Sequence, residues 1–175
     1  MLKMMLIVLI VIVAIILIIA ALKPSRLHVA RSISIKAPPE KIFTHLNNFN
    51  AWEAWSPWEK VDPACKRSYS GKESGVGAIY NWSGNKNIGE GRMEIVESIP
   101  FSKVVLKLDF IKPFEGHNMV EFTLQTQADV TTVTQAMSGE STFIHKLMGL
   151  CCNMDKMIGT KYEEGLSTLK AIVEK

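Results

Sequence analysis

One carboxylate, Asp155, stands out because it falls within an apolar helical pattern near the C-terminus. A helix advances about 100° per residue, which places Asp155 about 40° from Cys151 and inside the apolar stripe. A carboxylate that faces an apolar interior has a raised pKa or needs a hydrogen-bond donor. Such a group could serve as a general acid, a general base or an anchor for a polar ligand group. The alternative places Asp155 at the edge of the stripe, paired with a cation such as a lysine.

A second polar side chain, Gln135, lies in the alternating segment Val130 to Glu140. It alternates with Val133 and Met137, so the three side chains should share the inward face of a strand. An inward amide could hydrogen-bond a ligand or Asp155. Exposure at a sheet edge is the alternative, because the sequence does not fix the register.

Other patterns typical of catalysis or metal binding are missing from the sequence. His28, His45, His117 and His145 are scattered, with no Ser or Cys motif that would make one of them the base of a triad. No H-E-x-x-H or C-x-x-C spacing occurs. The glycines of "GVGAIY" (75–80) lead into a strand rather than a helix, which excludes a dinucleotide motif. We therefore expect neither a metal nor a cofactor.

The elements that position these residues fall into two unlike parts. Met4 to Leu22 is a run of 19 apolar residues, and as a helix it rises about 28 Å, enough to cross the hydrocarbon core of a bilayer. A cleaved signal peptide is the alternative, but its apolar region is shorter, about 7–15 residues, and small residues should follow where Ile18 and Ile19 stand. We predict a permanent membrane anchor over residues 1–24 and one domain over residues 25–175.

Charge and cysteine content suggest where that domain resides. Lys23, Arg26, Arg31 and Lys36 follow the span, whereas only Lys3 precedes it, which favours a cytoplasmic domain. The three cysteines, an odd number, give no disulfide framework and point the same way. The net charge is +3 without any basic run, so we expect no nucleic-acid partner.

The domain reads as strand, helix, short helix, six strands and long helix. Leu27 to Ala37 alternates as a strand does, and Pro38 and Pro39 suit the first turn of a helix. Six further strands are expected near residues 66–70, 78–83, 89–97, 103–112, 118–127 and 131–139. Apolar residues from Ile144 to Val173 share one helical face, and Gly149 and Gly159 are places where this helix could bend or break.

This order predicts an α+β fold. A curved antiparallel sheet of about seven strands wraps around the long C-terminal helix, and two short helices follow the first strand. One face of the sheet and one stripe of the helix are then buried against each other.

Four segments in a characteristic order carry a resemblance to a known family: "RSISIKAPPEKIF" (31–43), "WEAWSPWEKVDP" (52–63), "YSGKESGVGAIYNWSG" (69–84) and "MGLCCNMDKMIGTKYEEGLSTLK" (148–170). They resemble the SRPBCC superfamily of START-like, helix-grip domains, and in particular its bacterial polyketide cyclase/dehydrase branch. The resemblance covers residues 27–173. Members of this branch often carry an N-terminal apolar span.

The resemblance implies an apolar cavity between the sheet and the long helix. Trp52, Trp55 and Trp58 would form a wedge that closes one end of it, chiefly by burying aromatic surface; lining the cavity mouth is the alternative for one of them. The branch commonly has an aromatic residue, usually Trp, where this chain has Gln135. The candidate ligand contacts are Tyr80, Trp82, Phe122, Gln135, Asp155 and Tyr162; for Tyr80 and Trp82, ordinary core packing is the alternative.

Three functions follow as hypotheses. The first is a membrane-tethered binding module for a lipid-like or other hydrophobic small molecule. The second is a cyclase- or hydratase-type enzyme that uses Asp155 as general acid or base, with Gln135 orienting the substrate. The third is a protein-interaction or stress-response module with a vestigial cavity. The sequence names neither the ligand nor a protein partner.

Overall fold

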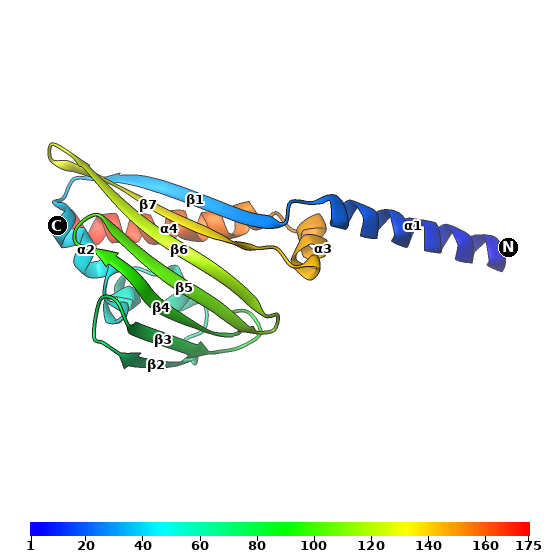
Figure 1. Cartoon of the computed structure of the whole chain (residues 1–175), viewed down its shortest axis with the longest axis horizontal. Coiled ribbons are helices and arrows are strands. Elements are labelled where there is room, and N and C mark those ends of the chain that lie inside the picture. The colour runs from blue at the N-terminus through cyan, green and yellow to red at the C-terminus, as the bar shows by residue number, and fades with distance from the viewer.

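Seven antiparallel strands form one sheet, in the order β1-β7-β6-β5-β4-β3-β2 (Figure 1). The computed structural model describes residues 1–175 except for the side chain of Cys151, which was the reference point of the helical wheel above. The first strand pairs with the last, and the others follow as hairpins, so β1 and β2 are the two edges. This confirms the predicted α+β fold. The strands are β1 (Arg26–Ile35), β2 (Lys66–Gly71), β3 (Ala78–Ser83), β4 (Glu90–Ile99), β5 (Lys103–Lys112), β6 (Gly116–Gln127) and β7 (Val130–Glu140).

The inward face of the sheet follows from the alternation of residue types along each strand. On β7, Val133, Gln135 and Met137 are buried, and the residues between them are more exposed. Val133 is paired with Ile33 of β1 on one side and with Leu124 of β6 on the other. Residues opposite each other on neighbouring strands point the same way. The inward direction predicted for Gln135 is therefore correct.

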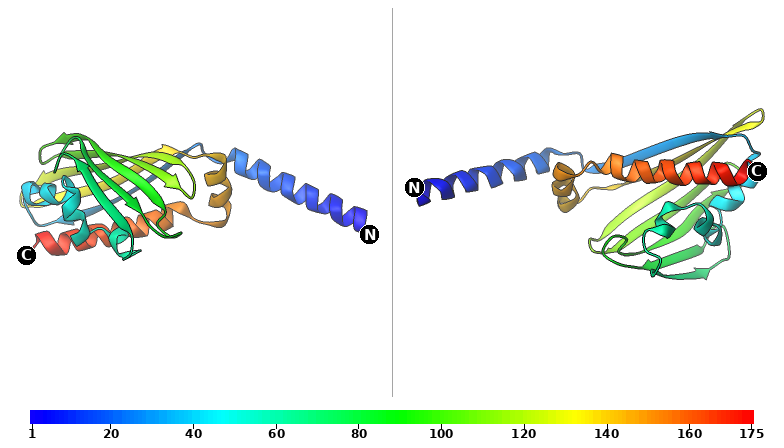
Figure 2. Two further views of the ribbon diagram at one scale, coloured as in Figure 1. Left: turned by 90° about the horizontal axis from the view of Figure 1, so that it is seen from below. Right: turned by 180° about the vertical axis from the view of Figure 1, so that it is seen from behind.

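Helices cover this inward face and one end of it. The helices are α1 (Leu2–Leu22), α2 (Pro39–Leu46), the 3-10 helices η1 (Phe49–Ala54) and η2 (Pro57–Lys60), α3 (Phe143–Cys151) and α4 (Met154–Val173). The long helix α4 runs along the sheet (Figure 2) and buries a stripe that includes Ile158, Tyr162, Leu166, Leu169 and Val173. The sheet and α4 thus form the predicted grip.

The C-terminal helix is interrupted, but not where the glycines indicated. It breaks at Cys152 and Asn153 into α3 and α4, whereas Gly149 and Gly159 lie inside the two helices. The side chain of Asn153 accepts a hydrogen bond of 2.9 Å from the backbone N–H of Lys156. Asparagine at this position satisfies a backbone donor that a helix start leaves free. The N-cap therefore fixes the start of α4.

The N-terminal helix α1 projects away from the rest of the molecule (Figure 1). It is long and apolar enough to cross a membrane, although a signal sequence meets the same criteria. Ala20 is its one buried residue among those described. The helix therefore contributes almost nothing to the core of the domain.

Candidate ligand-binding site

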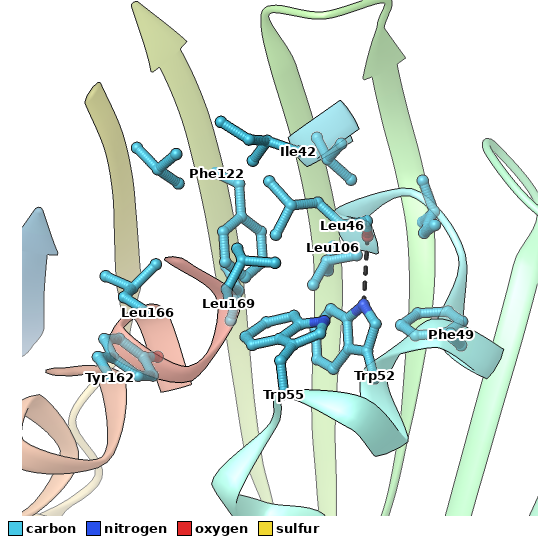
Figure 3. Close-up of a cluster of buried hydrophobic side chains, with 14 of the residues drawn as sticks. Ile42, Leu46, Phe49, Trp52, Trp55, Leu106, Phe122, Tyr162, Leu166 and Leu169 are labelled. Carbon is cyan, nitrogen blue, oxygen red and sulfur yellow. Dashed lines mark hydrogen bonds between the residues drawn. The ribbon is translucent and has the colours of Figure 1, made fainter. Parts of the chain in front are cut away.

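The tryptophan segment, residues 52–58, forms the centre of the aromatic core (Figure 3). Trp55 is 2% exposed, and its ring centroid lies 5.1 Å from that of Trp52. Both indoles meet Phe122 edge-on, with centroids 5.9 and 6.1 Å apart. The indole N–H of Trp52 donates to the carbonyl of Leu46 at 3.2 Å, and that of Trp55 donates to His45 at 3.3 Å. These bonds satisfy the polar edges, so the rings can pack as apolar surface.

A glycine on α4 lets this segment dock closely. A Cβ atom at Gly165 would lie 2.9 Å from Cδ of Pro57 and 3.5 Å from the ring of Trp55. Both neighbours are rigid rings with little freedom to move aside. The absence of a side chain at Gly165 therefore sets the distance between α4 and the tryptophan segment. Trp58, by contrast, is only half-buried.

A cavity of about 410 Å³ lies between the sheet, α4 and the tryptophan segment. Its walls are mostly apolar. Four of the six predicted ligand contacts line it, together with all three tryptophans of the segment. These four are Tyr80, Trp82, Gln135 and Tyr162. Phe122, which was predicted to contact the ligand, does not line the cavity. Trp52 and Trp55 cover its ring, and Phe122 is part of the core.

Two polar groups face this apolar cavity from opposite walls. Gln135 of β7 is 6% exposed and Tyr162 of α4 is 5% exposed. Neither side chain has a hydrogen-bond partner among the side chains and backbone groups that the structure describes. Burial raises the pKa of the Tyr162 phenol, which therefore stays protonated and able to donate at neutral pH. Buried polar groups normally have a partner, so these two are available to a ligand.

A buried carboxylate at the cavity wall was not predicted from the sequence. The Glu59 side chain is 8% exposed and forms an ion pair with Arg67. Its Oε1 accepts a hydrogen bond of 2.7 Å from the hydroxyl of Tyr80. Burial and this hydrogen bond raise the pKa of the Tyr80 phenol. Glu59 lies on η2, Arg67 on β2 and Tyr80 on β3, so only the tertiary fold brings the three together.

Asp155 does not face the cavity: of the two alternatives left by the sequence, the inward-facing carboxylate is wrong, and the position at the edge of the stripe, paired with a cation, is confirmed. Its side chain is 58% exposed, and Oδ2 lies 2.9 Å from the guanidinium of Arg31. Arg31 also contacts Glu163 at 2.7 Å. The hydrogen bond from Arg31 lowers the pKa of the Asp155 carboxyl rather than raising it. The helical wheel could not decide between the two alternatives, because it does not show that α4 packs along the edge strand β1, where one border of the apolar stripe meets solvent and a cation.

Buried lining residues mark the floor of the cavity, and exposed ones mark its rim. Trp55, Tyr80 and Gln135 belong to the floor. The rim includes exposed side chains from three places: Met148 of α3, Met157 of α4 and Phe114 of the turn between β5 and β6. Helix α3, the start of α4 and the turn between β5 and β6 lie at the end of the domain where α1 joins it (Figure 1), so the rim residues place the opening of the cavity at that end.

Metal binding finds no support in the described side chains, among which no three His, Cys, Asp or Glu residues come together. Of the cysteines, Cys65 is buried and Cys152 is exposed, and both are free thiols.

A known protein family matches most of the chain. Residues 26–174 match the family described as polyketide cyclase / dehydrase and lipid transport. No curated protein sequence matches this chain.

Solved structures share the fold at low sequence identity. A protein of Chromobacterium violaceum has a TM-score of 0.61 at 15% identity, over 87% of this chain and 99% of that one. The Aha1 dimer from Colwellia psychrerythraea has a TM-score of 0.55 at 22% identity, over 85% of this chain and 96% of that one. The di-domain ARO/CYC StfQ of the steffimycin biosynthetic pathway has a TM-score of 0.60 at 12% identity, over 85% of this chain and 51% of its own length.

Proposed function

The chain belongs to the polyketide cyclase / dehydrase and lipid transport family, and from that premise we propose that it is a membrane-tethered protein that binds a hydrophobic small molecule. The cavity between the sheet and α4 is the binding site. Its volume of about 410 Å³ is within the range of roughly 300–1,000 Å³ that small-molecule sites occupy. Burial of an apolar ligand there contributes about 25 cal/mol per Å² removed from water.

The observation that carries this proposal is the pair of polar groups inside an otherwise apolar cavity. Gln135 offers a donor and an acceptor, and the protonated Tyr162 offers a donor. We therefore infer a ligand that is mostly hydrocarbon but carries a carbonyl, hydroxyl or carboxyl group. Each hydrogen bond fixes the orientation of the ligand and leaves fewer polar atoms unsatisfied.

Binding without turnover is the form of the proposal that the wall chemistry supports. An acid or base in catalysis must be close to the reacting atoms and free to exchange a proton. Asp155 lies outside the cavity, and Glu59 is already engaged by Arg67 and Tyr80. The cavity also argues against the hypothesis of a vestigial, filled interior.

The tether completes the proposal. In it, α1 spans the bilayer as a permanent anchor, and the domain over residues 25–175 stands on the side with more Lys and Arg, the cytoplasm. A binding site held at a membrane has access to the hydrophobic molecules dissolved there.

Native mass spectrometry of the full chain, released from detergent micelles, tests this function. We expect a fraction of the wild-type protein to retain a non-covalent hydrophobic ligand. The double variant Gln135→Leu with Tyr162→Phe should lose a polar-headed ligand while keeping its fold by circular dichroism. A wild-type protein that carries no adduct and gains none from added lipid extract would contradict the proposal.

A further inference from the structure

Helix α3 presents an apolar face to solvent. Phe143, Ile144, Leu147 and Met148 are all exposed, and their spacing places them on one side of the helix. Exposed apolar patches of this kind mark surfaces that bind a protein or a membrane. The opposite side of α3 faces the domain, where His145 lines the cavity.

The position of α3 is tied to the end of the apolar helix α1. Lys23, directly after α1, donates from Nζ to the carbonyl of Gly149. Lys146 donates from Nζ to the hydroxyl of Ser25 at 2.9 Å. The backbone N–H of Ser141 donates to the carbonyl of Ser25, also at 2.9 Å. Helix α3 contacts α1 near the C-terminal end of α1, while the rest of α1 projects away from the domain (Figures 1 and 2).

We propose that α3 lies in the interface of the bilayer that α1 spans, with its apolar face inserted at the boundary between headgroups and acyl chains. This inference rests on the membrane tether of the proposed function. Lys23 follows the last apolar residue of α1 and therefore sits at the level of the headgroups. A helix held against that residue is at the same depth. Interfacial amphipathic helices insert their apolar face by about 5–10 Å.

The charges beside α3 select anionic phospholipids as its partner. An open groove of about 470 Å³ between α3 and the start of β1 is lined by Lys23, Arg26, Lys146 and His145. No Asp or Glu of the described chain lines this groove, and none forms an ion pair with Lys23, Arg26 or Lys146. Basic residues next to a membrane attract anionic lipids electrostatically. Phosphate headgroups of the same leaflet therefore fit the groove.

This placement brings the cavity rim onto the membrane surface. His145 lines both the basic groove and the cavity, and Met148 and Met157 are exposed on the rim. An amphiphile that leaves the bilayer next to α3 could then enter the cavity without crossing bulk water. The inference thus adds a route of entry to the proposed binding function.

Lipid-borne quenchers can locate α3 in the full chain. A dye sensitive to its surroundings is attached to a single cysteine, with the native cysteines changed as Cys65→Ala, Cys151→Ser and Cys152→Ser. Three labelling variants are compared in vesicles: Leu147→Cys on α3, Val11→Cys in the middle of α1, and Gln127→Cys in the hairpin between β6 and β7. Figure 1 shows that hairpin at the opposite end of the domain. Vesicles of phosphatidylcholine and phosphatidylglycerol carry a nitroxide on either lipid.

We expect nitroxide lipids to abolish most of the fluorescence at Leu147 and Val11 and to leave Gln127 unchanged. Nitroxide phosphatidylglycerol should quench the Leu147 label more than nitroxide phosphatidylcholine does, and Arg26→Gln should reduce that preference. A quenched Val11 beside an unquenched Leu147 would overturn this inference alone. An unquenched Val11 would overturn the tether and, with it, the inference. A blue-shifted but unquenched Leu147 label would show that protein, not lipid, covers α3, and would also refute it.

Discussion

The hydroxyl of Tyr80 donates a hydrogen bond of 2.7 Å to the buried carboxylate of Glu59, at the wall of the cavity. This bond connects β3 to the short helix η2, which contains Trp58, the last tryptophan of the tryptophan segment. Together with the ion pair between Glu59 and Arg67, it supplies the partners that a buried charge requires. Hydrogen bonding and ion pairing among Glu59, Tyr80 and Arg67 therefore stabilise this wall of the cavity, which is otherwise lined by aromatic side chains.

Tyr80→Phe should weaken this network without creating a void. Loss of one hydrogen bond to a buried charged group costs about 1–3 kcal/mol in the free energy of unfolding. Urea denaturation followed by circular dichroism measures the change. Tyr69→Phe is the matched control, because Tyr69 is on the neighbouring strand and exposed. Equal effects of the two variants would refute a role for the Glu59 bond.

Deletion of residues 1–24 should leave a folded domain. Helix α1 buries one residue, Ala20, whereas the core consists of residues from Val29 onward. Helix α1 and the core thus bury separate surfaces, as independent units do. Circular dichroism and a cooperative thermal transition of residues 25–175 would verify this. Consistently insoluble or unfolded product would show that α1 is part of the fold.

Gly165→Ala and Gly159→Ala should change stability by different amounts although both glycines lie on α4. A methyl at Gly165 meets the rigid rings of Pro57 and Trp55, so overpacking should cost roughly 1–3 kcal/mol. A methyl at Gly159 meets the end of the flexible Arg31 side chain, which must shift within its ion pairs with Asp155 and Glu163. The gain of up to about 1 kcal/mol from replacing a helical glycine should roughly offset that loss. Denaturant midpoints of the two variants provide the test. A Gly165→Ala protein as stable as Gly159→Ala would contradict the close docking of the tryptophan segment.

Asp155→Asn should change how the stability of the folded protein depends on pH in the acid range. The hydrogen bond from Arg31 lowers the folded-state pKa of Asp155 below its ordinary value of 3.8. The stability that the ionised Asp155 carboxylate contributes is therefore complete above about pH 3.8, and it is lost as the pH falls through the lower folded-state pKa. Thermal unfolding at several pH values should show wild type above the variant near neutrality and the two converging in acid. A difference that persists in acid would contradict this linkage.

Much of the fold could be predicted because period-two alternation is a local property. Two strand ranges, 78–83 and 103–112, match the structure at both ends. The break before α4 was missed because apolar residues continue at helical spacing across it, although Asn153 is a typical N-cap residue. The helical wheel gave the angle of Asp155 but not what lies opposite it. Arg31, an inward-facing charge on β1, was the available signal for that partner.

Whether a cavity residue could be predicted from the sequence depended on whether its position follows from its own element or from the tertiary fold. Gln135 and Tyr162 line the cavity, as the periodicity of each element indicates, and their contact with a ligand stays a prediction. Phe122 was misassigned because periodicity gives the inward direction but not whether tryptophans cover the ring. Glu59 was missed because its partners, Arg67 and Tyr80, come from two other elements.

Binding of a long-chain fatty acid to residues 25–175, measured by equilibrium dialysis, tests the central claim most directly. Two variants add the same bulk at different places: Met137→Trp fills the cavity from β7, and Met119→Trp lies on the exposed face of β6. We expect saturable binding to wild type and to Met119→Trp, and at least about tenfold weaker binding to Met137→Trp, a loss of about 1.4 kcal/mol. Equal affinity of the two folded variants, or no saturable binding to wild type, would contradict the cavity as the site.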